Sequence, residues 1–359
     1  MNLIRITSNA LARVAAVLGV AALTLGAGTA AAQAPATCAK VDVVKVQEYA
    51  GIIQNLVPWA AIDQGIFKKY CLEAKMTSFP SGPAALAASL QGGLDFISLA
   101  PDTVYVPVSQ GFDLKIVAFM NDTIHYVLVV GKDVPLPHKA EGYPAVMKDL
   151  VGKKIGVNAL GSTTDILAKS NFDAAGLDYK QANWIAYGPP IAGIAGLQSG
   201  SLDAAEFFGD GMDIAAAATG GTIVGDLRDP NTKASAQIAA LRGSSLLWAA
   251  QSAFVKANPD VVRRFARANN EAIEWIKDPK NFESVVKIVR EKAPSPPGVA
   301  DPEGLLRERV KRYIPQENSR ASLRALKAWS EWDVTMKRIS KPADIDSLLW
   351  ETAREMVTP

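Results

Sequence analysis

The chain has 359 residues, of which 49% are hydrophobic and 21% are charged, as is typical of a globular protein long enough for two α/β lobes. Lysine and arginine together number 38, and aspartate and glutamate number 36. This near balance, without a basic run, gives no reason to expect nucleic acid as a partner.

Residues 1–32 have the pattern of a signal peptide. Arg5 and Arg13 give a positive start, an apolar run covers 14–28, and the small residues that follow predict cleavage after Ala32. The alternative, an N-terminal membrane anchor, needs about 20 apolar residues, and this run is shorter. We therefore expect an exported, periplasmic protein whose folded part follows the cleavage site.

Two cysteines, Cys38 and Cys71, each stand just before a predicted strand, at 41–46 and 72–79. If these strands are parallel neighbours, their amino ends lie about 5 Å apart, within disulfide reach. An oxidising compartment favours that bond. The pattern predicts a structural disulfide at the strand ends opposite the ligand, and two free buried thiols are the alternative.

Helical and strand-like patterns alternate along the first two thirds of the chain, which indicates parallel sheets with helices on both faces. A loop pattern at 132–147 interrupts the alternation, which then restarts and so predicts a second unit built like the first. The predicted helices are 55–70, 83–91, 102–110, 163–175 and 191–198. The predicted strands after the first two are 95–99, 114–120, 126–130, 154–158, 182–186, 204–208 and 246–251.

An internal repeat agrees with two similar units. Residues 90–95 resemble residues 197–203, because in each a helix ends at glycine and Leu-Asp opens a strand. A chance recurrence, common in α/β proteins, is the alternative. The last third of the chain is mostly helical, and its helices are expected to cover the first sheet, at 258–276, 282–292, 302–313, 319–338 and 345–356.

Four segments, in this order, are similar to the substrate-binding proteins of ABC importers in the nitrate, sulfonate, taurine and thiamine-precursor group. They are 58–67, 82–86 followed by 93–96, 149–157 leading to 161–164, and 254–262 with 275–276 downstream. The resemblance implies a two-lobed type II periplasmic-binding-protein fold, with lobe 1 at 33–130 and 226–359 and lobe 2 at 131–225. It also implies capture of a small organic molecule of sulfonate, zwitterionic or heteroaromatic type between the lobes, without a cofactor, and docking on a membrane permease.

In open parallel sheets, ligands bind beyond the carboxyl ends of strands, at the starts of helices. The sharpest candidate is the Gly-Ser-Thr-Thr run at 161–164, where backbone N–H groups and hydroxyls suit an anion; a plain helix cap is the alternative. Asp102, Glu206 and Asp210 either cap helices or bind a cationic or amide group. The full set of candidate ligand-binding residues is Tyr49, Gly51, Ser81, Gly82, Asp102, Thr103, Thr123, His125, Gly161, Ser162, Thr163, Thr164, Tyr187, Glu206, Phe208 and Asp210.

The chain shows no catalytic signature. It contains no G-x-S-x-G elbow, no H-E-x-x-H, no phosphate loop and no Cys/His metal spacing, and its two histidines are a poor supply of general bases. We therefore expect a monomeric binding protein with no catalytic residue and no metal. An exported enzyme of the pyrimidine-precursor-synthase class and a ligand-sensing domain are the alternatives.

Overall fold

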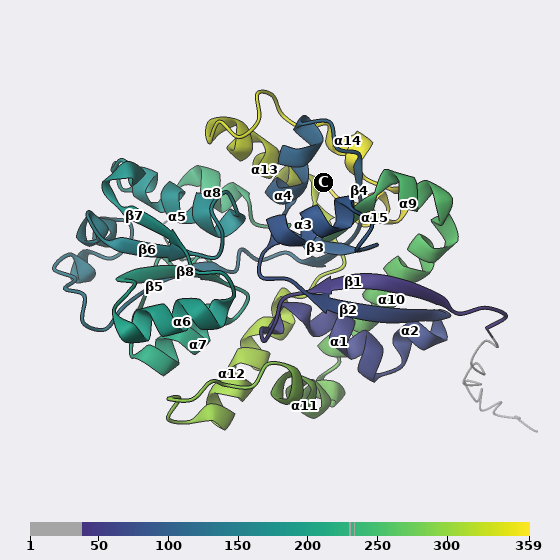
Figure 1. Cartoon of the computed structure of the whole chain (residues 1–359), viewed down its shortest axis with the longest axis horizontal. Helices are drawn as coiled ribbons and strands as arrows, with labels where there is room; N and C mark the ends of the chain where they lie inside the picture. Colours follow the sequence, from purple (N-terminus) through teal and green to yellow (C-terminus); the bar gives the residue numbers. More distant parts are fainter. Residues whose placement is uncertain (1–37, 230, 233) are drawn as a thin grey trace, which may run out of the picture. The chain divides into compact units, whose positions relative to one another are not determined.

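The computed structural model describes residues 38–359 except 230 and 233 (Figure 1). The predicted signal peptide and its cleavage site lie outside the described residues. Within the described part of the chain, no helix is both long enough and apolar enough to cross a bilayer.

Lobe 1, as we use the term, is the part built on the first sheet. Strand β1 pairs in parallel with β2, and a parallel bridge from Val46 to Phe96 links β1 to β3. Strand β10 is antiparallel to both β3 and β4, so the strand order is β2-β1-β3-β10-β4. The strands are β1 (Asp42–Glu48), β2 (Leu72–Ser78), β3 (Ile97–Leu99), β4 (Leu114–Asn121) and β10 (Leu246–Gln251).

Lobe 2 is the part built on the second sheet, with the order β7-β6-β8-β5-β9. Strand β6 is parallel to β7 and β8, whereas β5 is antiparallel to β8 and β9. The two sheets therefore share one order, with the antiparallel strand in the fourth place. The strands are β5 (Tyr126–Val130), β6 (Lys154–Val157), β7 (Asn183–Ala186), β8 (Ala204–Phe208) and β9 (Thr222–Val224).

The placement of β5 differs from the predicted boundary, which put residues up to 130 in lobe 1. All five residues of β5 are buried, and the strand pairs only with strands of lobe 2. The physical reason is the route of the chain. Strands β5 and β10 are the first strands after each crossing between lobes, and each enters its sheet from the opposite end and runs antiparallel.

Helices cover both faces of each sheet. In Figure 1, α5 lies on one side of the lobe 2 sheet and α6 and α7 lie on the other. The helices before the return crossing are α1 (Leu56–Asp63), α2 (Ile66–Lys69), α3 (Gly82–Leu90), α4 (Pro101–Ser109), α5 (Thr163–Ala174), α6 (Pro190–Ser199), α7 (Gly211–Thr219) and α8 (Ala236–Ala240). The single helix predicted over 55–70 is broken at Gly65, whose φ of 67° is left-handed.

The C-terminal helices pack on lobe 1, as predicted. Phe265 of α10 stacks on Phe96, with ring centroids 3.7 Å apart, and Trp329 of α13 is buried on the other face of the sheet. These helices are α9 (Ser252–Ala257), α10 (Pro259–Lys277), α11 (Phe282–Lys292), α12 (Pro302–Tyr313), α13 (Leu323–Thr335), α14 (Ile345–Leu348) and α15 (Glu351–Arg354). The predicted helix 319–338 begins later, because β11 (Ala321–Ser322) pairs first with β12 (Val357–Thr358).

The internal repeat is a structural equivalence. Asp95 accepts a hydrogen bond from the backbone N of Lys45 at 2.8 Å, and Asp203 accepts one from the backbone N of Lys154 at 2.7 Å. Each lysine also donates from Nζ to the carbonyl of a left-handed glycine, Gly92 after α3 or Gly200 after α6, just before the aspartate. Asp95 therefore fixes β1 against β3, and Asp203 fixes β6 against β8.

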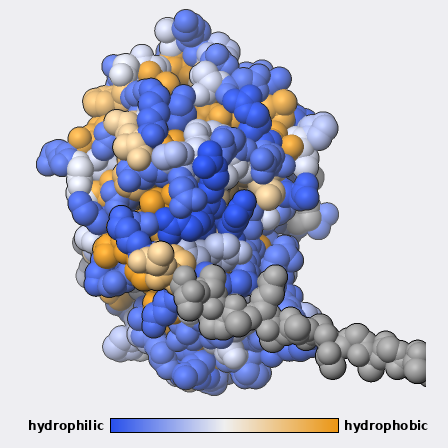
Figure 2. All heavy atoms as spheres, turned by 90° about the vertical axis from the view of Figure 1, so that its right-hand side faces the viewer, coloured by the Kyte–Doolittle hydropathy of each residue, from blue (hydrophilic) through white to orange (hydrophobic). Residues whose placement is uncertain are grey.

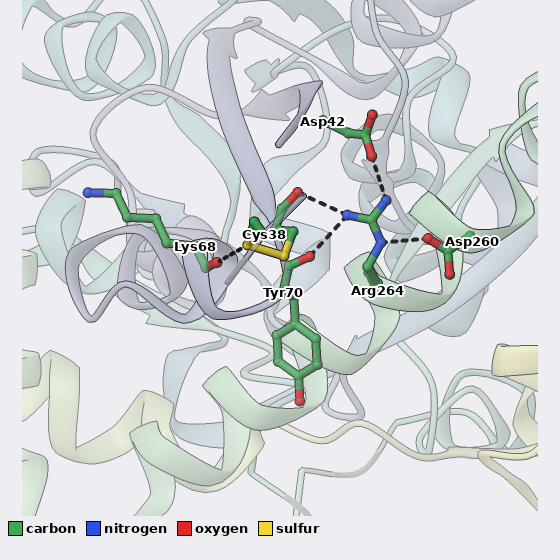
Figure 3. Close-up of a disulfide and its surroundings, with 7 residues drawn as sticks. Cys38, Asp42, Lys68, Tyr70, Asp260 and Arg264 are labelled. Atoms are coloured by element: carbon green, nitrogen blue, oxygen red, sulfur yellow. Dashed lines mark hydrogen bonds and ion pairs between the residues drawn. A yellow bond between two sulfur atoms is a disulfide. The ribbon is translucent and has the colours of Figure 1, made fainter. Parts of the chain in front are cut away.

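The predicted disulfide is confirmed. Cys38 and Cys71 are joined, with Cα atoms 5.5 Å apart, at the amino ends of β1 and β2 (Figure 3). Beside it, Arg264 of α10 donates to the carbonyl oxygens of Tyr70 and Cys71 and pairs with Asp42 at 2.5 Å. The start of the fold is thus tied to α10.

The surface of lobe 1 in Figure 2 carries mainly hydrophilic residues, with apolar ones in small groups. Small groups of exposed apolar side chains are ordinary on the surfaces of folded proteins.

Candidate functional site

A cavity of about 30 Å³ lies between the two lobes. Each lobe contributes half of the lining residues, and none of the lining side chains is charged. Lobe 1 provides Tyr49, Gln54, Gly82, Pro83, Ala100 and Thr103, and lobe 2 provides Tyr126, Asn158, Ser162, Thr163, Thr164 and Phe208. The two similar sheets therefore both contribute to one cavity.

Three helices begin at this cavity. Gly82 opens α3, Ala100 is the N-cap of α4, and Ser162 is the N-cap of α5. Ser162 makes no side-chain capping bond, so it does not cap the first N–H groups of α5. In α4, Pro101 has no N–H and the Thr103 N–H bonds to the Ala100 carbonyl at 3.1 Å. Three positive helix ends around an uncharged cavity create a site that favours a negative group.

Three of the hydroxyl protons at the cavity are donated to protein acceptors. Tyr49 donates to the Ser98 carbonyl at 2.9 Å, Ser162 donates to the Ala159 carbonyl at 2.6 Å, and Thr163 donates to Asp102 at 2.8 Å. A hydroxyl has one proton and two lone pairs, so these oxygens are left as acceptors. Backbone N–H groups at the helix starts, the Gln54 amide and the Tyr126 hydroxyl can therefore donate to an anion, and the oxygens of Tyr49, Ser162 and Thr163 can accept from N–H or O–H groups.

Aromatic rings form part of the cavity wall. Tyr49 meets Phe208 edge-on, with ring centroids 5.2 Å apart, and Tyr126 also lines the cavity. Burial raises the pKa of Tyr49 to about 12 and also raises the pKa of Tyr126, so both are neutral phenols. These rings suit an apolar or ring-shaped part of a ligand.

Hydrogen bonds cross directly from one lobe to the other around the cavity. Thr163 bonds to Asp102 and lies 3.3 Å from the Thr103 hydroxyl. Asn158 donates to the Pro80 carbonyl at 2.8 Å. These bonds tie the two lobes together beside the cavity.

Seven of the residues predicted from sequence line this cavity. They are Tyr49, Gly82, Thr103, Ser162, Thr163, Thr164 and Phe208. Ser81 lies beside it and caps α3 by accepting from the Ala84 N–H. The Gly161 carbonyl accepts from Arg338 at 3.2 Å.

The three predicted carboxylates do not line the cavity, which gives no support to the alternative in which they bind a cationic or amide group. Asp102 is paired with Arg338 at 2.6 Å, and Asp210 is paired with Arg309 at 2.5 Å. Glu206 is fully buried in lobe 2, and burial raises its pKa well above the usual range. Ion pairing satisfies the two aspartates, and burial disfavours the charged form of the glutamate.

Tyr187 also lies elsewhere. Its ring stacks on Phe207 in the core beneath α6, and its hydroxyl donates to the Glu206 carbonyl at 2.7 Å. Phe207 and Phe208 are adjacent on β8 and so point to opposite faces of the sheet. Tyr187 packs on the same face of the sheet as Phe207, whereas the cavity lies on the opposite face, with Phe208.

Thr123 and His125 lie in the segment that crosses from β4 in lobe 1 to β5 in lobe 2, and Gly51 lies in a separate hollow. His125 is fully buried, its Nδ1 lies 3.0 Å from the Thr123 carbonyl, and burial lowers its pKa to about 4, so its ring is neutral. The Thr123 hydroxyl donates to Asp122. Gly51 lines an apolar hollow with Ile191, apart from the polar cavity.

Sequence reasoning missed five lining residues. Asn158 follows strand β6 directly, so the rule of strand carboxyl ends could have found it. Tyr126 begins a strand, and only the antiparallel direction of β5 brings it to the same edge. The other three are Gln54, Pro83 and Ala100. Within 38–359, apart from the two undescribed positions, no cluster of His, Cys, Asp or Glu could hold a metal.

Comparisons with known proteins agree with this architecture. The alkanesulfonate-binding protein SsuA from Xanthomonas axonopodis pv. citri, bound to MOPS, superposes with a TM-score of 0.67 at 16% identity, over 87% of this chain and 99% of that one. The periplasmic nitrate-binding protein NrtA from Synechocystis PCC 6803 gives 0.63 at 14% identity, over 88% and 86%. The desulfurization enzyme DszB also shares the fold, with a TM-score of 0.58 at 15% identity, over 88% and 98%.

A Brucella abortus (strain 2308) protein, provisionally named a binding protein, is 30% identical over 145 residues, which is 40% of this chain. The match spans 41% of that relative's length. The model of the NMT1-like family matches residues 49–290, well over half of the chain. The chain therefore has the fold of periplasmic binding proteins and belongs to the NMT1-like family.

Proposed function

We propose that this protein is a periplasmic solute-binding protein that captures a small organic anion between its lobes and delivers it to an ABC permease. One observation carries the proposal. Helices α3, α4 and α5, from both lobes, begin at one cavity whose lining contains no charged side chain. Such helix starts hold oxyanions without a cationic side chain.

The proposed ligand class is a sulfonate or a similar small oxyanion. Its anionic group would meet the first turns of α4 and α5, and its carbon part would meet Tyr49 and Phe208. A cavity of about 30 Å³ has room for about two water molecules. Binding therefore needs the lobes to part and close again around the ligand, as in hinge-closing proteins.

Reversible binding is favoured over catalysis because the lining includes no carboxylate and no lysine that could act as an acid or a base. The hydroxyl protons of Tyr49, Ser162 and Thr163 are donated to protein acceptors, and the lining includes no histidine or cysteine. The enzyme and sensor alternatives share this fold, and product analysis distinguishes them. A compound that is bound and chemically changed would identify an enzyme.

Isothermal titration calorimetry against ethanesulfonate, taurine, MOPS, nitrate and acetate tests the proposal. We expect at least one sulfonate to bind and nitrate to bind more weakly, because nitrate leaves the aromatic wall uncovered. Taurine against ethanesulfonate shows whether an added ammonium donor is accepted by the hydroxyl oxygens. Failure of every anion to bind a folded protein contradicts the proposal.

A matched pair of double variants locates the site. Ser162→Leu with Thr163→Leu fills the cavity and should abolish binding while the circular dichroism spectrum is kept. Ser199→Leu with Thr335→Leu makes the same chemical change at exposed positions and should leave affinity unchanged. Equal affinities in the two would remove this cavity from consideration.

Export is tested separately. Expression of the whole chain in a Gram-negative host should give a periplasmic protein whose first residue is Gln33, as read by N-terminal sequencing. Retention in the cytoplasm with residues 1–32 intact contradicts the periplasmic part of the proposal.

A further inference from the structure

Asp102 and Asp210 occupy equivalent positions in the two lobes. The repeat aspartates Asp95 and Asp203 are separated by 108 residues, and so are Asp102 and Asp210. Each follows the third strand of its sheet, at the start of the next helix. Asp102 lies in the first turn of α4, and Asp210 is the N-cap of α7.

Each of these aspartates reaches into the opposite lobe. Asp102, in lobe 1, accepts from the Thr163 hydroxyl of lobe 2 at 2.8 Å. Asp210, in lobe 2, accepts from the backbone N of Ile53 in lobe 1 at 3.1 Å. Both carboxylates are at most 1% exposed. The repeat thus places two buried charges at matching points where the lobes meet.

An arginine from the C-terminal helical segment neutralises each charge. Arg338, just after α13, donates to the second oxygen of Asp102 at 2.6 Å and also reaches the Gly161 carbonyl of lobe 2 at 3.2 Å. Arg309 of α12 donates from Nε to the second oxygen of Asp210 at 2.6 Å and is itself 1% exposed. This segment packs on lobe 1, so Arg309 pairs with an aspartate of the other lobe.

The two pairs respond differently when the lobes part. Arg338 remains with Asp102 and Asp333, because all three are in lobe 1, and only the contacts to Thr163 and Gly161 are lost. Arg309 and Asp210 separate completely and become hydrated. A buried charge that loses its partner is strongly unfavourable, so an unpaired Arg309 or Asp210 penalises the closed form far more than the open form.

We propose that both pairs act as interlobe latches, Asp210–Arg309 directly and Asp102–Arg338 through its bonds to Thr163 and Gly161. Arg309 and Arg338 are then positioning residues that set the closed geometry without touching the ligand. The link from closure to affinity rests on the proposed function. The latches themselves concern the free protein and do not depend on what the ligand is.

Double electron–electron resonance on the ligand-free protein tests the latches. Nitroxide labels at Lys180→Cys and Lys287→Cys report the distance between lobe 2 and lobe 1, and both positions are exposed. The labelled parent should populate mainly the distance seen in this structure. Arg309→Met should raise the ratio of open to closed protein at least about tenfold, because Asp210 is left unpaired only on closing.

A rescue variant and a control complete the test. Arg309→Met combined with Asp210→Asn removes both charges and should restore most of the closed population. Asp102→Asn should open the protein less, because Arg338 keeps Asp333. Arg312→Met, on the same helix, removes a half-exposed interlobe ion pair with Asp213 and should change little.

The outcomes are decisive. An unchanged distance distribution in Arg309→Met, or a double variant as open as the single one, overturns the latch. If Arg309→Met does not fold, Asp210→Asn, which leaves Arg309 unpaired on closing, must itself open the protein. Ethanesulfonate titrations form a separate arm. A latch variant that opens while no parent protein binds any anion keeps the latch and rejects the proposed function.

Discussion

The hydroxyl of Thr163 donates a hydrogen bond to Asp102 at 2.8 Å, which joins the start of α5 in lobe 2 to the start of α4 in lobe 1. Both side chains are buried, and Arg338 holds the other oxygen of Asp102. Asp102 is therefore a partner of a cavity residue. Because the Thr163 hydroxyl donates its one proton to the Asp102 carboxylate, its oxygen can only accept hydrogen bonds from other neighbours.

Thr163→Val keeps the volume of the side chain and removes this bond. We expect sulfonate affinity to fall by about tenfold or more, because a hydrogen bond to a buried charged group contributes about 1.5–3 kcal/mol. Calorimetry with ethanesulfonate measures it. Thr335→Val, at an exposed position on α13, is the control, and equal affinities in the two variants would show that the bond does not support closure.

Removal of the disulfide should destabilise the fold. Cys38 and Cys71 close a loop of 33 residues, for which chain entropy predicts about 3–4 kcal/mol. The double variant Cys38→Ser with Cys71→Ser should lower the urea midpoint accordingly while leaving anion affinity unchanged, since the bond lies at the strand ends away from the cavity. A midpoint that reduction by dithiothreitol does not move contradicts this expectation.

Because Glu206 is buried, we expect the free energy of unfolding to fall as pH rises. Burial raises its pKa well above the usual range, so the folded state holds a proton that the unfolded state releases above about pH 4.3. The folded state therefore loses up to about 1.4 kcal/mol per pH unit until the folded pKa is reached.

Glu206→Gln removes this dependence. The variant and the parent should have similar stabilities near pH 4, and the variant should be the more stable protein at pH 8, as measured by chemical denaturation at each pH. The exposed Glu355→Gln is the matched control. A difference between variant and parent that is constant with pH would show that Glu206 is ionised in the folded protein.

Because His125 is buried, we expect the free energy of unfolding to rise with pH, in a different pH range. Burial lowers its pKa to about 4, below the unfolded value of about 6.5, so the unfolded state binds a proton first as pH falls. Stability from the neutral ring is complete above about pH 6.5 and is lost toward pH 4, by about 3 kcal/mol. His125→Phe keeps a ring beside Tyr126 and should flatten the curve in that window, relative to the parent.

His138→Gln serves as the comparison for His125→Phe, because it removes the other histidine, whose ring is partly exposed and bonded to Asp149. If His138→Gln flattens the curve as much as His125→Phe, the slope does not come from the buried ring.

The local pattern predicted the elements that form each lobe. Alternating apolar runs and helix starts indicated parallel sheets, and the Leu-Asp repeat indicated two similar units, because a helix end followed by a strand start can be read from adjacent residues. The bonds of Asp95 and Asp203 themselves reach Lys45 and Lys154, 50 and 49 residues away. The disulfide was predictable because both cysteines precede neighbouring strands. Ser162 and Thr163 were found because helix starts follow strand ends.

Tertiary structure alone decided the partners of the charged groups and the edge that each crossing strand occupies. Asp102 and Asp210 meet arginines 236 and 99 residues away, a distance along the chain that no local pattern reaches. Tyr126 enters the cavity only because β5 runs antiparallel to its neighbours. Sequence periodicity fixes which face of an element is buried, whereas the direction of a strand and the pairing of buried charges depend on how distant segments pack.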